Sequence, residues 1–185
     1  EERRDLSKSM LFDICDVLIK SEYFTEIALV SSEEEITQYE NYDDITYLRE
    51  NEVNGVDNAV ELGNRYFIEK GFDATVVIPG DIPLIHNKVL EKLFNLIKDN
   101  QVIITPSRKK NGTNLLFRSP PDVIGTSYDN NSYFRHLDMI RVRNLQYGIY
   151  LEDSIRLDLD EPEDIKIINE RLLDSRTKSL LKKLN

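Results

Sequence analysis

Hydrophobic residues recur along this chain in two patterns, one typical of buried strands and one typical of helices. Short runs rich in branched apolar residues predict strands over 27–30, 45–48, 75–78, 102–105, 114–117, 148–151 and 155–157. Apolar residues at helical spacing predict helices over 1–19, 57–70, 87–98, 132–143 and 162–174. The alternation of the two kinds of element predicts an α/β fold of three layers, α/β/α, with a mostly parallel mixed sheet.

The pattern indicates one domain over residues 1–174, followed by a C-terminal tail over 175–185. The tail is basic and carries leucines, which predicts a terminal helix that is either frayed or docked. The chain opens in a helical pattern with no strand before it, so we expect that a segment upstream is missing.

Composition limits the function classes. The chain has 185 residues, and a hydrophobic share of 40% is enough for a single core. Its 24 Lys and Arg against 34 Asp and Glu give a net charge of −10, which argues against nucleic acid and anionic membranes as partners. The single cysteine, Cys15, cannot form an internal disulfide and favours a cytoplasmic location. No apolar run approaches the length of about 18 residues that a membrane span needs. The sequence also leaves open whether the protein forms a homodimer.

The strand predicted over 75–78 ends abruptly at Pro79-Gly80-Asp81-Ile82-Pro83. Open α/β sheets bind ligands at the carboxyl ends of their strands, so Asp81 is a candidate site residue. Gly80 permits a close approach of the backbone, and the two prolines stiffen the turn. An Asp81 that only caps the following turn is the alternative.

A second acidic segment, Asp158-Leu159-Asp160-Glu161-Pro162-Glu163-Asp164, stands where a strand is expected to give way to a helix. Together with Asp81, its carboxylates could bind one hard cation such as Mg²⁺ or Mn²⁺. A helix start with Asp160 as N-cap and Pro162 in the first turn is the alternative, but it leaves Asp158 unexplained.

Two turns carry candidate ligand contacts. Gly55 precedes a helix start, where backbone N–H groups and the side chain of Asp57 or Asn58 could meet a nucleobase or ribose. A helix cap alone also explains this turn. Farther along, three consecutive cations, Arg108 to Lys110, lead into Gly112-Thr113-Asn114, which could hold phosphate by charge and by hydrogen bonds. A solvated hairpin tip is the alternative there.

The helix predicted over 132–143 offers a further anion site at its amino end. Ser132 is expected to be its N-cap. His136 follows one turn later, and we expect a packed or capping histidine rather than a catalytic one.

In this order along the chain, the motifs resemble the CofC family, the 2-phospho-L-lactate guanylyltransferases of deazaflavin coenzyme biosynthesis. The resemblance covers about residues 1 to 169 and includes Asn58-Ala59, Gly80-Asp81-Ile82-Pro83-Leu84, Gly112-Thr113-Asn114, Ser132-Tyr133-Phe134-Arg135-His136 and the segment from Asp158 to Asp164. It implies a fold like that of nucleotide-diphospho-sugar transferases. It also implies transfer of GMP from GTP to a phosphorylated small acid, with release of pyrophosphate.

The resemblance also implies roles for single residues. Asp81 and Asp158 would be the catalytic carboxylates and, with Asp160, would hold one or two Mg²⁺ (or Mn²⁺) ions. Thr113 and Ser132, with Arg108 as a weaker candidate, would bind the phosphorylated acid. The nucleotide would be bound by Gly55, Asp57, Asn58 and Gly80.

This chain departs from the family in two places. Family members begin with a strand and a basic loop that holds the triphosphate, and this sequence starts after that point. The turn before Ser132 is usually richer in glycine, whereas here it reads Asp129-Asn130-Asn131.

Other functions stay open. Related enzymes accept phosphoenolpyruvate or 3-phosphoglycerate, and a guanylyl or cytidylyl transferase of the same fold could act on a molybdopterin or a sugar phosphate. A non-catalytic nucleotide-binding paralogue fits the absent basic loop. A phosphoacceptor signalling domain would use Asp81 at a strand end, but the prolines and the second acidic segment fit it poorly.

Overall fold

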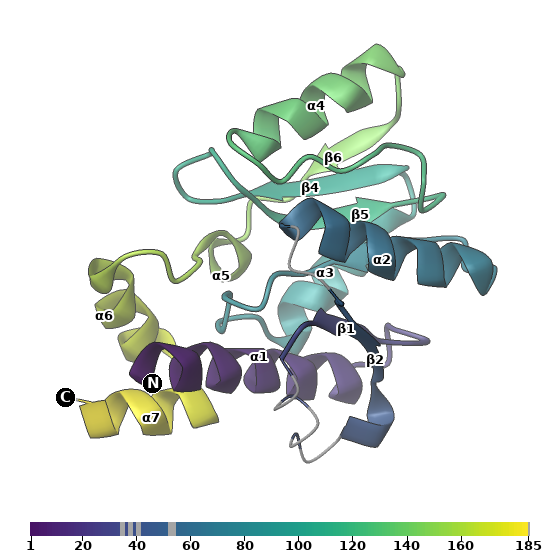
Figure 1. The fold of residues 1–185 in the computed structure, drawn as a ribbon. Coiled ribbons are helices and arrows are strands. Elements are labelled where there is room, and N and C mark those ends of the chain that lie inside the picture. The colour runs from purple at the N-terminus through teal and green to yellow at the C-terminus, as the bar shows by residue number, and fades with distance from the viewer. Residues whose placement is uncertain (34–35, 37–38, 40–41, 52–54, 185) are drawn as a thin grey trace.

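The computed structural model describes residues 1–33, 36, 39, 42–51 and 55–184 (Figure 1). Its strands are β1 (Ala28–Ser31), β2 (Thr46–Arg49), β3 (Thr75–Val77), β4 (Val102–Pro106), β5 (Thr113–Arg118) and β6 (Tyr147–Ile149). Its helices are α1 (Glu2–Lys20), η2 (Tyr42–Asp44), α2 (Val56–Glu69), α3 (Asn87–Ile97), α4 (Ser132–Val142), α5 (Asp153–Arg156), α6 (Pro162–Arg171) and α7 (Arg176–Leu184). Within this described part, no helix has the length and apolar character needed to cross a membrane.

The strands form two sheets of mixed direction. β1 and β2 make a parallel pair, and the larger sheet has the order β3-β5-β4-β6. β5 runs antiparallel to both of its neighbours, whereas β6 runs parallel to β4. The connection between β4 and β5 is a tight turn, in which the Ser107 N–H donates to the Gly112 carbonyl at 2.9 Å. Because so short a turn can only join antiparallel strands, it makes the sheet mixed, as predicted.

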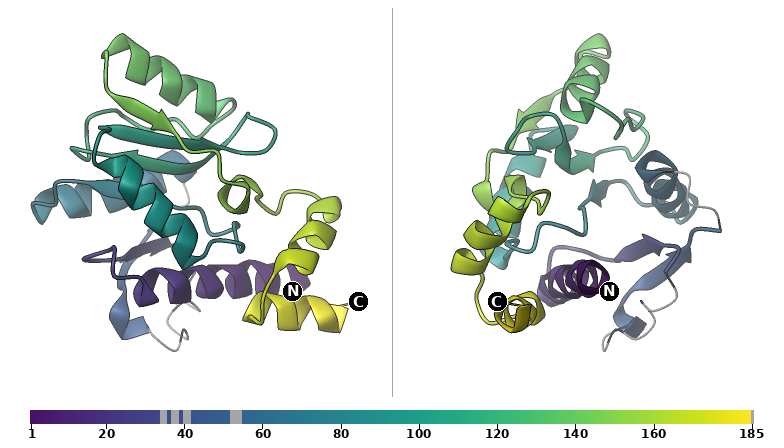
Figure 2. Two further views of the ribbon diagram at one scale, coloured as in Figure 1. Left: turned by 180° about the vertical axis from the view of Figure 1, so that it is seen from behind. Right: turned by 60° about the vertical axis from the view of Figure 1, so that its left-hand side comes forward.

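Helices cover both faces of the larger sheet, which gives the expected three layers (Figure 2). Side chains of a strand alternate between faces, and β4 follows this rule. Ile103 packs with Leu90 and Leu93 of α3, while Ile104 packs with Leu137 and other residues of α4. The core therefore consists of two apolar layers on opposite sides of one sheet.

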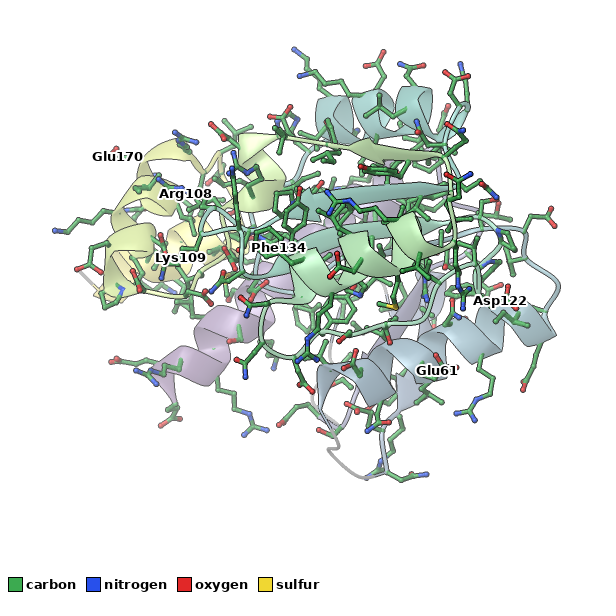
Figure 3. The ribbon with its side chains drawn as sticks, turned by 90° about the horizontal axis from the view of Figure 1, so that it is seen from above. Glu61, Arg108, Lys109, Asp122, Phe134 and Glu170 are labelled. Atoms are coloured by element: carbon green, nitrogen blue, oxygen red, sulfur yellow. The ribbon has the colours of Figure 1, made fainter. Side chains whose placement is uncertain are left out.

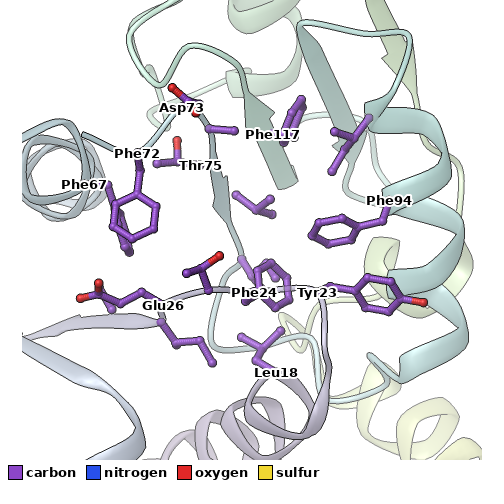
Figure 4. Close-up of a pocket in the computed structure, with 17 residues that line it drawn as sticks. Leu18, Tyr23, Phe24, Glu26, Phe67, Phe72, Asp73, Thr75, Phe94 and Phe117 are labelled. Atoms are coloured by element: carbon purple, nitrogen blue, oxygen red, sulfur yellow. The ribbon is translucent and has the colours of Figure 1, made fainter. Parts of the chain in front are cut away.

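β1 and β3 border the same gap between the two sheets. One cavity of about 390 Å³ is lined by residues 25–28 from one side and 73–76 from the other. Aromatic side chains surround it, among them Phe24, Phe67, Phe94 and Phe117 (Figure 4). A second cavity, of about 520 Å³, is lined by residues 28–31 and 75–81. Among the described strands, β1 pairs only with β2 and β3 only with β5, so each has one edge without a strand partner.

Helix α1 packs on both sheets and so joins them. Its Ile14 belongs to the core of the larger sheet, with Ile103 and Leu115. Its Phe12 and Cys15 pack instead with Ile45, next to β2. Helix α2 also contacts both β1 and β3, so two helices hold the two sheets together.

Helix α7 packs on α1, so the C-terminal tail forms a docked helix rather than a frayed one (Figure 1). Both carboxylate oxygens of Asp13 accept backbone N–H groups at the start of α7, from Arg176 at 3.0 Å and Thr177 at 2.9 Å. The Arg176 guanidinium also lies 2.5 Å from the Asp16 carboxylate. A side chain of one helix therefore provides the cap of the other.

One predicted strand is wrong. Ile155 and Arg156 belong to a single helical turn, α5, because the Glu152 carbonyl accepts N–H groups from both at 3.0 Å, and Leu157 is the C-cap of this turn. Ile155 and Leu157 are both buried, and this spacing of two had suggested a strand. The helix predicted over 162–174 ends at Arg171, and the other predicted elements are confirmed to within two residues at each end.

Candidate functional site

Asp81 lies just beyond the carboxyl end of β3, where the chain turns away from the sheet. A Cβ atom at Gly80 would come within 3.3 Å of the Leu11 side chain, so the glycine lets this turn pass close to α1. The Asp81 carbonyl accepts the Leu159 N–H at 3.1 Å. This hydrogen bond holds the second acidic segment beside the first.

The carboxylates of these two segments influence each other. Burial, then the charge of Asp158, and to a smaller extent that of Asp160, raise the pKa of Asp81 to about 6. Burial and Asp160 also raise the pKa of Asp158, although a hydrogen bond from Asn114 opposes the rise. The fold thus concentrates negative charge at one place, where a cation would relieve the repulsion.

A metal ion fits this place only with additional ligands. In the part of the chain that the structure covers, no group of three or more His, Cys, Asp or Glu side chains is arranged to hold an ion. The Oδ1 atom of Asp81 is nevertheless buried and has no hydrogen-bond partner within the described residues. Mg²⁺ is typically bound by one or two carboxylates together with water and substrate phosphates. Asp81 and Asp158 match that donor set.

The alternative interpretation, with Asp160 as the N-cap of the next helix, is wrong. Glu161 is the N-cap of α6, Pro162 occupies its first turn, and Asp164 completes a capping box. The Asp164 carboxylate accepts the Glu161 N–H at 3.0 Å and the Asp160 N–H at 3.3 Å. The cap therefore leaves the Asp160 side chain unused.

Two cavities meet at Gly80 and Asp81. The main cleft is the cavity of about 520 Å³ described above, and it also contains Thr113, Asn114 and Ser132. The side cleft has a volume of about 470 Å³ and contains Arg4 and Lys8 of α1 together with Glu33, whose Oε2 lies 2.6 Å from Arg4 Nη2. Asp81 thus lies between a cleft with hydroxyl groups and a cleft with cations.

Thr113 and Ser132 are brought together in the main cleft. Ser132 is the first residue of α4, and the N-cap is Asn131, with φ of 61°, so the cap predicted at Ser132 is wrong. Its Oγ atom instead donates to Thr113 Oγ1 at 3.1 Å. His136 is fully buried, and its Nδ1 lies 3.0 Å from the same Thr113 oxygen. A packed histidine was expected, but its contact with Thr113 was not.

The turn before α2 borders the main cleft, but its predicted residues are not in the lining. Val56, Ala59 and Val60 line the cleft, whereas Gly55, Asp57 and Asn58 do not. Gly55 is the N-cap of α2 with a φ of 87°, in the region that favours glycine. Asp57 Oδ1 accepts the Tyr128 N–H at 2.8 Å and so ties the loop before α4 to α2.

Arg108 lies away from the other predicted acid-binding residues. Its Nη1 is 3.9 Å from Asp164 Oδ1, and the neighbouring Lys109 Nζ is 2.5 Å from Glu161 Oε1. Figure 3 shows both cations beside α6. The acidic start of α6 neutralises these cations, and Arg108 is not among the residues that line the main cleft.

Three residues of the site had no assigned role in the sequence. Asn114 donates to the Ile155 carbonyl at 3.0 Å and also stabilises the Asp158 carboxylate. Its place in the Gly112-Thr113-Asn114 motif was the sequence signal from which a role for Asn114 could have been predicted. Arg118 and Tyr128 line the main cleft with buried polar groups, and no sequence pattern distinguished them.

Comparison with known families gives one match over the whole chain. The family model described as "Guanylyl transferase CofC like" matches residues 1–185. A 2-phospho-L-lactate guanylyltransferase of Methanocaldococcus jannaschii is 36% identical over 184 residues, which cover 100% of this chain and 79% of that protein. A phosphoenolpyruvate guanylyltransferase of Sphaerobacter thermophilus is 25% identical over 166 residues, which cover 90% of this chain and 80% of that protein.

Solved structures show the same fold. A putative nucleotide-diphospho-sugar transferase of Desulfovibrio desulfuricans superposes with a TM-score of 0.76 at 15% identity, covering 96% of this chain and 81% of that one. A 4-diphosphocytidyl-2C-methyl-D-erythritol synthase of Anaerococcus prevotii gives a TM-score of 0.60 at 13% identity, covering 87% and 84%. The fold is thus that of nucleotide-diphospho-sugar transferases, as expected.

The raised pKa of Asp81 predicts the stability of a variant. In the folded state this pKa rises from its usual 3.8 to about 6, so the charged carboxylate costs stability above pH 6, and this cost disappears below about pH 4. We expect Asp81→Asn, in buffer with EDTA, to raise the free energy of unfolding at pH 8 by about 1–3 kcal/mol, since one pKa unit corresponds to about 1.4 kcal/mol. At pH 4 the gain should vanish. Urea unfolding followed by circular dichroism measures both values.

Asp5→Asn, at an exposed position of α1, is the matched control and should change stability by less than about 0.5 kcal/mol. A wild-type protein that is as stable as Asp81→Asn at pH 8 would contradict the repulsion.

Proposed function

This chain belongs to the family of CofC-like guanylyl transferases, and on that basis we propose that it transfers GMP from GTP to 2-phospho-L-lactate and releases pyrophosphate. The product would serve the synthesis of a deazaflavin coenzyme. Relatives named for this reaction, at 31–36% identity over the full length of the chain, support it.

The observation that supports this activity most directly is the position of Asp81 between the two clefts. A nucleotidyl transfer must bring two phosphate-bearing molecules together at one point. On one side of Asp81, Lys8 and Arg4, which is paired with Glu33 in this structure, would meet a polyphosphate. On the other side, Thr113 and Ser132 of the main cleft would meet the second substrate. Asp81 lies where the two clefts meet, and Asp158, which lines neither cleft, is close enough for its charge to raise the pKa of Asp81.

In the transfer, a phosphate oxygen of the acceptor forms a bond to the α-phosphorus of GTP, and the bond from that phosphorus to the pyrophosphate oxygen breaks. The acceptor phosphate is ionised near neutral pH because its second pKa is about 6, so no side chain has to remove a proton. Thr113 and Ser132 would bind and orient the phosphorylated acid, Thr113 through its hydroxyl and Ser132 through its backbone N–H at the start of α4, because the Ser132 hydroxyl already donates to Thr113. His136 lies beside these hydroxyl groups, but it is buried and its pKa falls to about 4, which makes it a weak base. This is consistent with a reaction in which no side chain has to remove a proton.

Asp81 and Asp158, with Asp160 near them, would hold Mg²⁺ or Mn²⁺. A divalent ion supplies positive charge that lowers the repulsion between two polyanions and stabilises a departing pyrophosphate. The buried, unpartnered Oδ1 of Asp81 supports this assignment. Asn114 orients the Asp158 carboxylate by hydrogen bonding.

Phosphoenolpyruvate is the second candidate acceptor, because a relative at 25% identity carries that name. The two acids differ at the carbon next to the carboxylate, which is tetrahedral in phospholactate and planar in phosphoenolpyruvate. Relatives at higher identity are named for 2-phospho-L-lactate, and we therefore favour it.

We further propose that the gap between β1 and β3 holds one more strand, followed by a basic loop, from a segment outside residues 1–185. Each edge lacks a strand partner within the described residues, and the cavities lie between these edges. A strand there that continued into α1 and then β1 would form the usual right-handed β-α-β unit. Its loop would emerge at the carboxyl ends of the strands, on the side of Asp81.

The activity is tested by an acceptor panel. The full-length protein is incubated with GTP, Mg²⁺ and, in separate reactions, 2-phospho-L-lactate, phosphoenolpyruvate or 3-phosphoglycerate, and released pyrophosphate is measured. We expect the highest kcat/KM with 2-phospho-L-lactate. GTP binding without pyrophosphate release in every reaction would instead support a non-catalytic paralogue.

The two central carboxylates can be tested separately. We expect Asp81→Asn and Asp158→Asn each to lower kcat/KM by at least about a hundredfold, the scale of losing one preorganised electrostatic group. Glu170→Gln, at an exposed position of α6 outside the acidic segment, is the control and should stay within twofold of wild type. Near-normal turnover of both aspartate variants at limiting Mg²⁺ would refute their assignment.

The proposed strand predicts different GTP affinities for the full-length protein and for residues 1–185 alone. We expect the full-length protein to bind GTP at least about tenfold more tightly than residues 1–185 alone, because charged hydrogen bonds to phosphate are lost in the shorter chain. Calorimetry measures the affinities, and hydrogen exchange should show protection of Ala28–Ser31 and Thr75–Val77 only in the full-length protein. Equal GTP affinity and equal exchange in the two chains would contradict the strand.

A further inference from the structure

A chain of hydrogen bonds, partly buried at its start and buried at its end, leads from the loop before α4 to the hydroxyl group of Thr113. The backbone N–H of Ser127 donates to His136 Nε2 at 3.0 Å. His136 Nδ1 lies 3.0 Å from Thr113 Oγ1, and Ser132 Oγ donates to the same oxygen at 3.1 Å. His136 itself is fully buried.

The first of these bonds fixes the tautomer of His136. A backbone N–H can only donate, so Nε2 must present its lone pair to Ser127. A neutral imidazole with a lone pair on Nε2 carries its proton on Nδ1. The ring is neutral at pH 7 because burial, and after it the charge of Arg118, lowers its pKa, against a smaller opposite effect of Asp57. Nδ1 therefore donates to Thr113.

The tautomer in turn fixes the direction of the Thr113 hydroxyl. A hydroxyl oxygen accepts two hydrogen bonds and donates one. His136 and Ser132 fill both accepting positions of Thr113 Oγ1. The remaining group is its proton, and Thr113 lines the main cleft. Thr113 can thus act toward a ligand only as a hydrogen-bond donor.

We propose that His136 is a positioning residue of the acceptor site, which holds the Thr113 hydroxyl as a donor toward an anionic oxygen of the phosphorylated acid. This assignment rests on the proposed function, because it places the acid in the main cleft. His136 does not touch the substrate, and its effect passes through Thr113. The site consequently favours an oxygen that only accepts hydrogen bonds, as phosphate and carboxylate oxygens do.

Variants of His136 separate this role from a purely structural one. His136→Phe keeps a ring of similar size but removes both nitrogens, whereas His136→Asn keeps an N–H donor near the position of Nδ1. We expect His136→Phe to raise KM for 2-phospho-L-lactate by at least about tenfold, as for a lost hydrogen bond to a charged group, with KM for GTP within twofold of wild type. His136→Asn should recover most of the loss. Thr113→Val should give the same change as His136→Phe.

The second histidine of the chain, His86, provides the matched control, since it is exposed at the start of α3. His86→Phe and His86→Asn should leave both KM values unchanged. Equal defects in His136→Phe and His136→Asn, or an equal rise in KM for GTP, would overturn the positioning role.

Nitrogen-15 NMR of the imidazole tests the same assignment without turnover. In the wild-type protein we expect the proton of His136 on Nδ1 from pH 6 to 8, and an Nε2-protonated ring would overturn the assignment. If the wild type releases no pyrophosphate with any acceptor, the proposed function fails. The NMR result, together with calorimetric binding of 2-phospho-L-lactate to wild type and to His136→Phe, then still decides the role of His136.

Discussion

The site depends on the repulsion between two carboxylates that the fold holds close together. The hydrogen bond from the Leu159 N–H to the Asp81 carbonyl joins their segments through the backbone, so the two segments cannot separate without breaking it. Burial then makes the repulsion stronger, because little water remains to screen it. Such an arrangement is unfavourable for the protein alone and favourable for binding a cation, which is a common trade between stability and function.

The layers of the fold explain how distant segments reach this place. The short turn between β4 and β5 reverses the chain, so that Thr113 begins a strand next to the end of another. Helix α4, which packs on one face of the larger sheet, then places Ser132 and His136 against Thr113. Two elements that are distant in sequence, β5 and α4, therefore contribute to one small cluster of polar groups.

Much of this was readable from the sequence, because the relevant signals are local. The abrupt end of a β-branched run marked Asp81, and the order of strands and helices gave the α/β class. The pairing of Arg108 could not be predicted, because its partner, Asp164, lies on α6, far along the chain. The tautomer of His136 depends on the Ser127 N–H, a contact that arises only from the folded loop. The strand predicted over 155–157 was wrong because a single helical turn, like a strand, can bury two residues that are two positions apart.

The two strand edges that face the gap have a consequence for handling this chain. Unpartnered edges attract the backbone of other molecules and are common starting points for aggregation. β1 and β3 present such edges on either side of an apolar, aromatic cavity. The net charge of −10 keeps molecules apart in dilute buffer. Added salt screens this repulsion but leaves the edges unchanged, so the colloidal stability of residues 1–185 should decline as ionic strength rises.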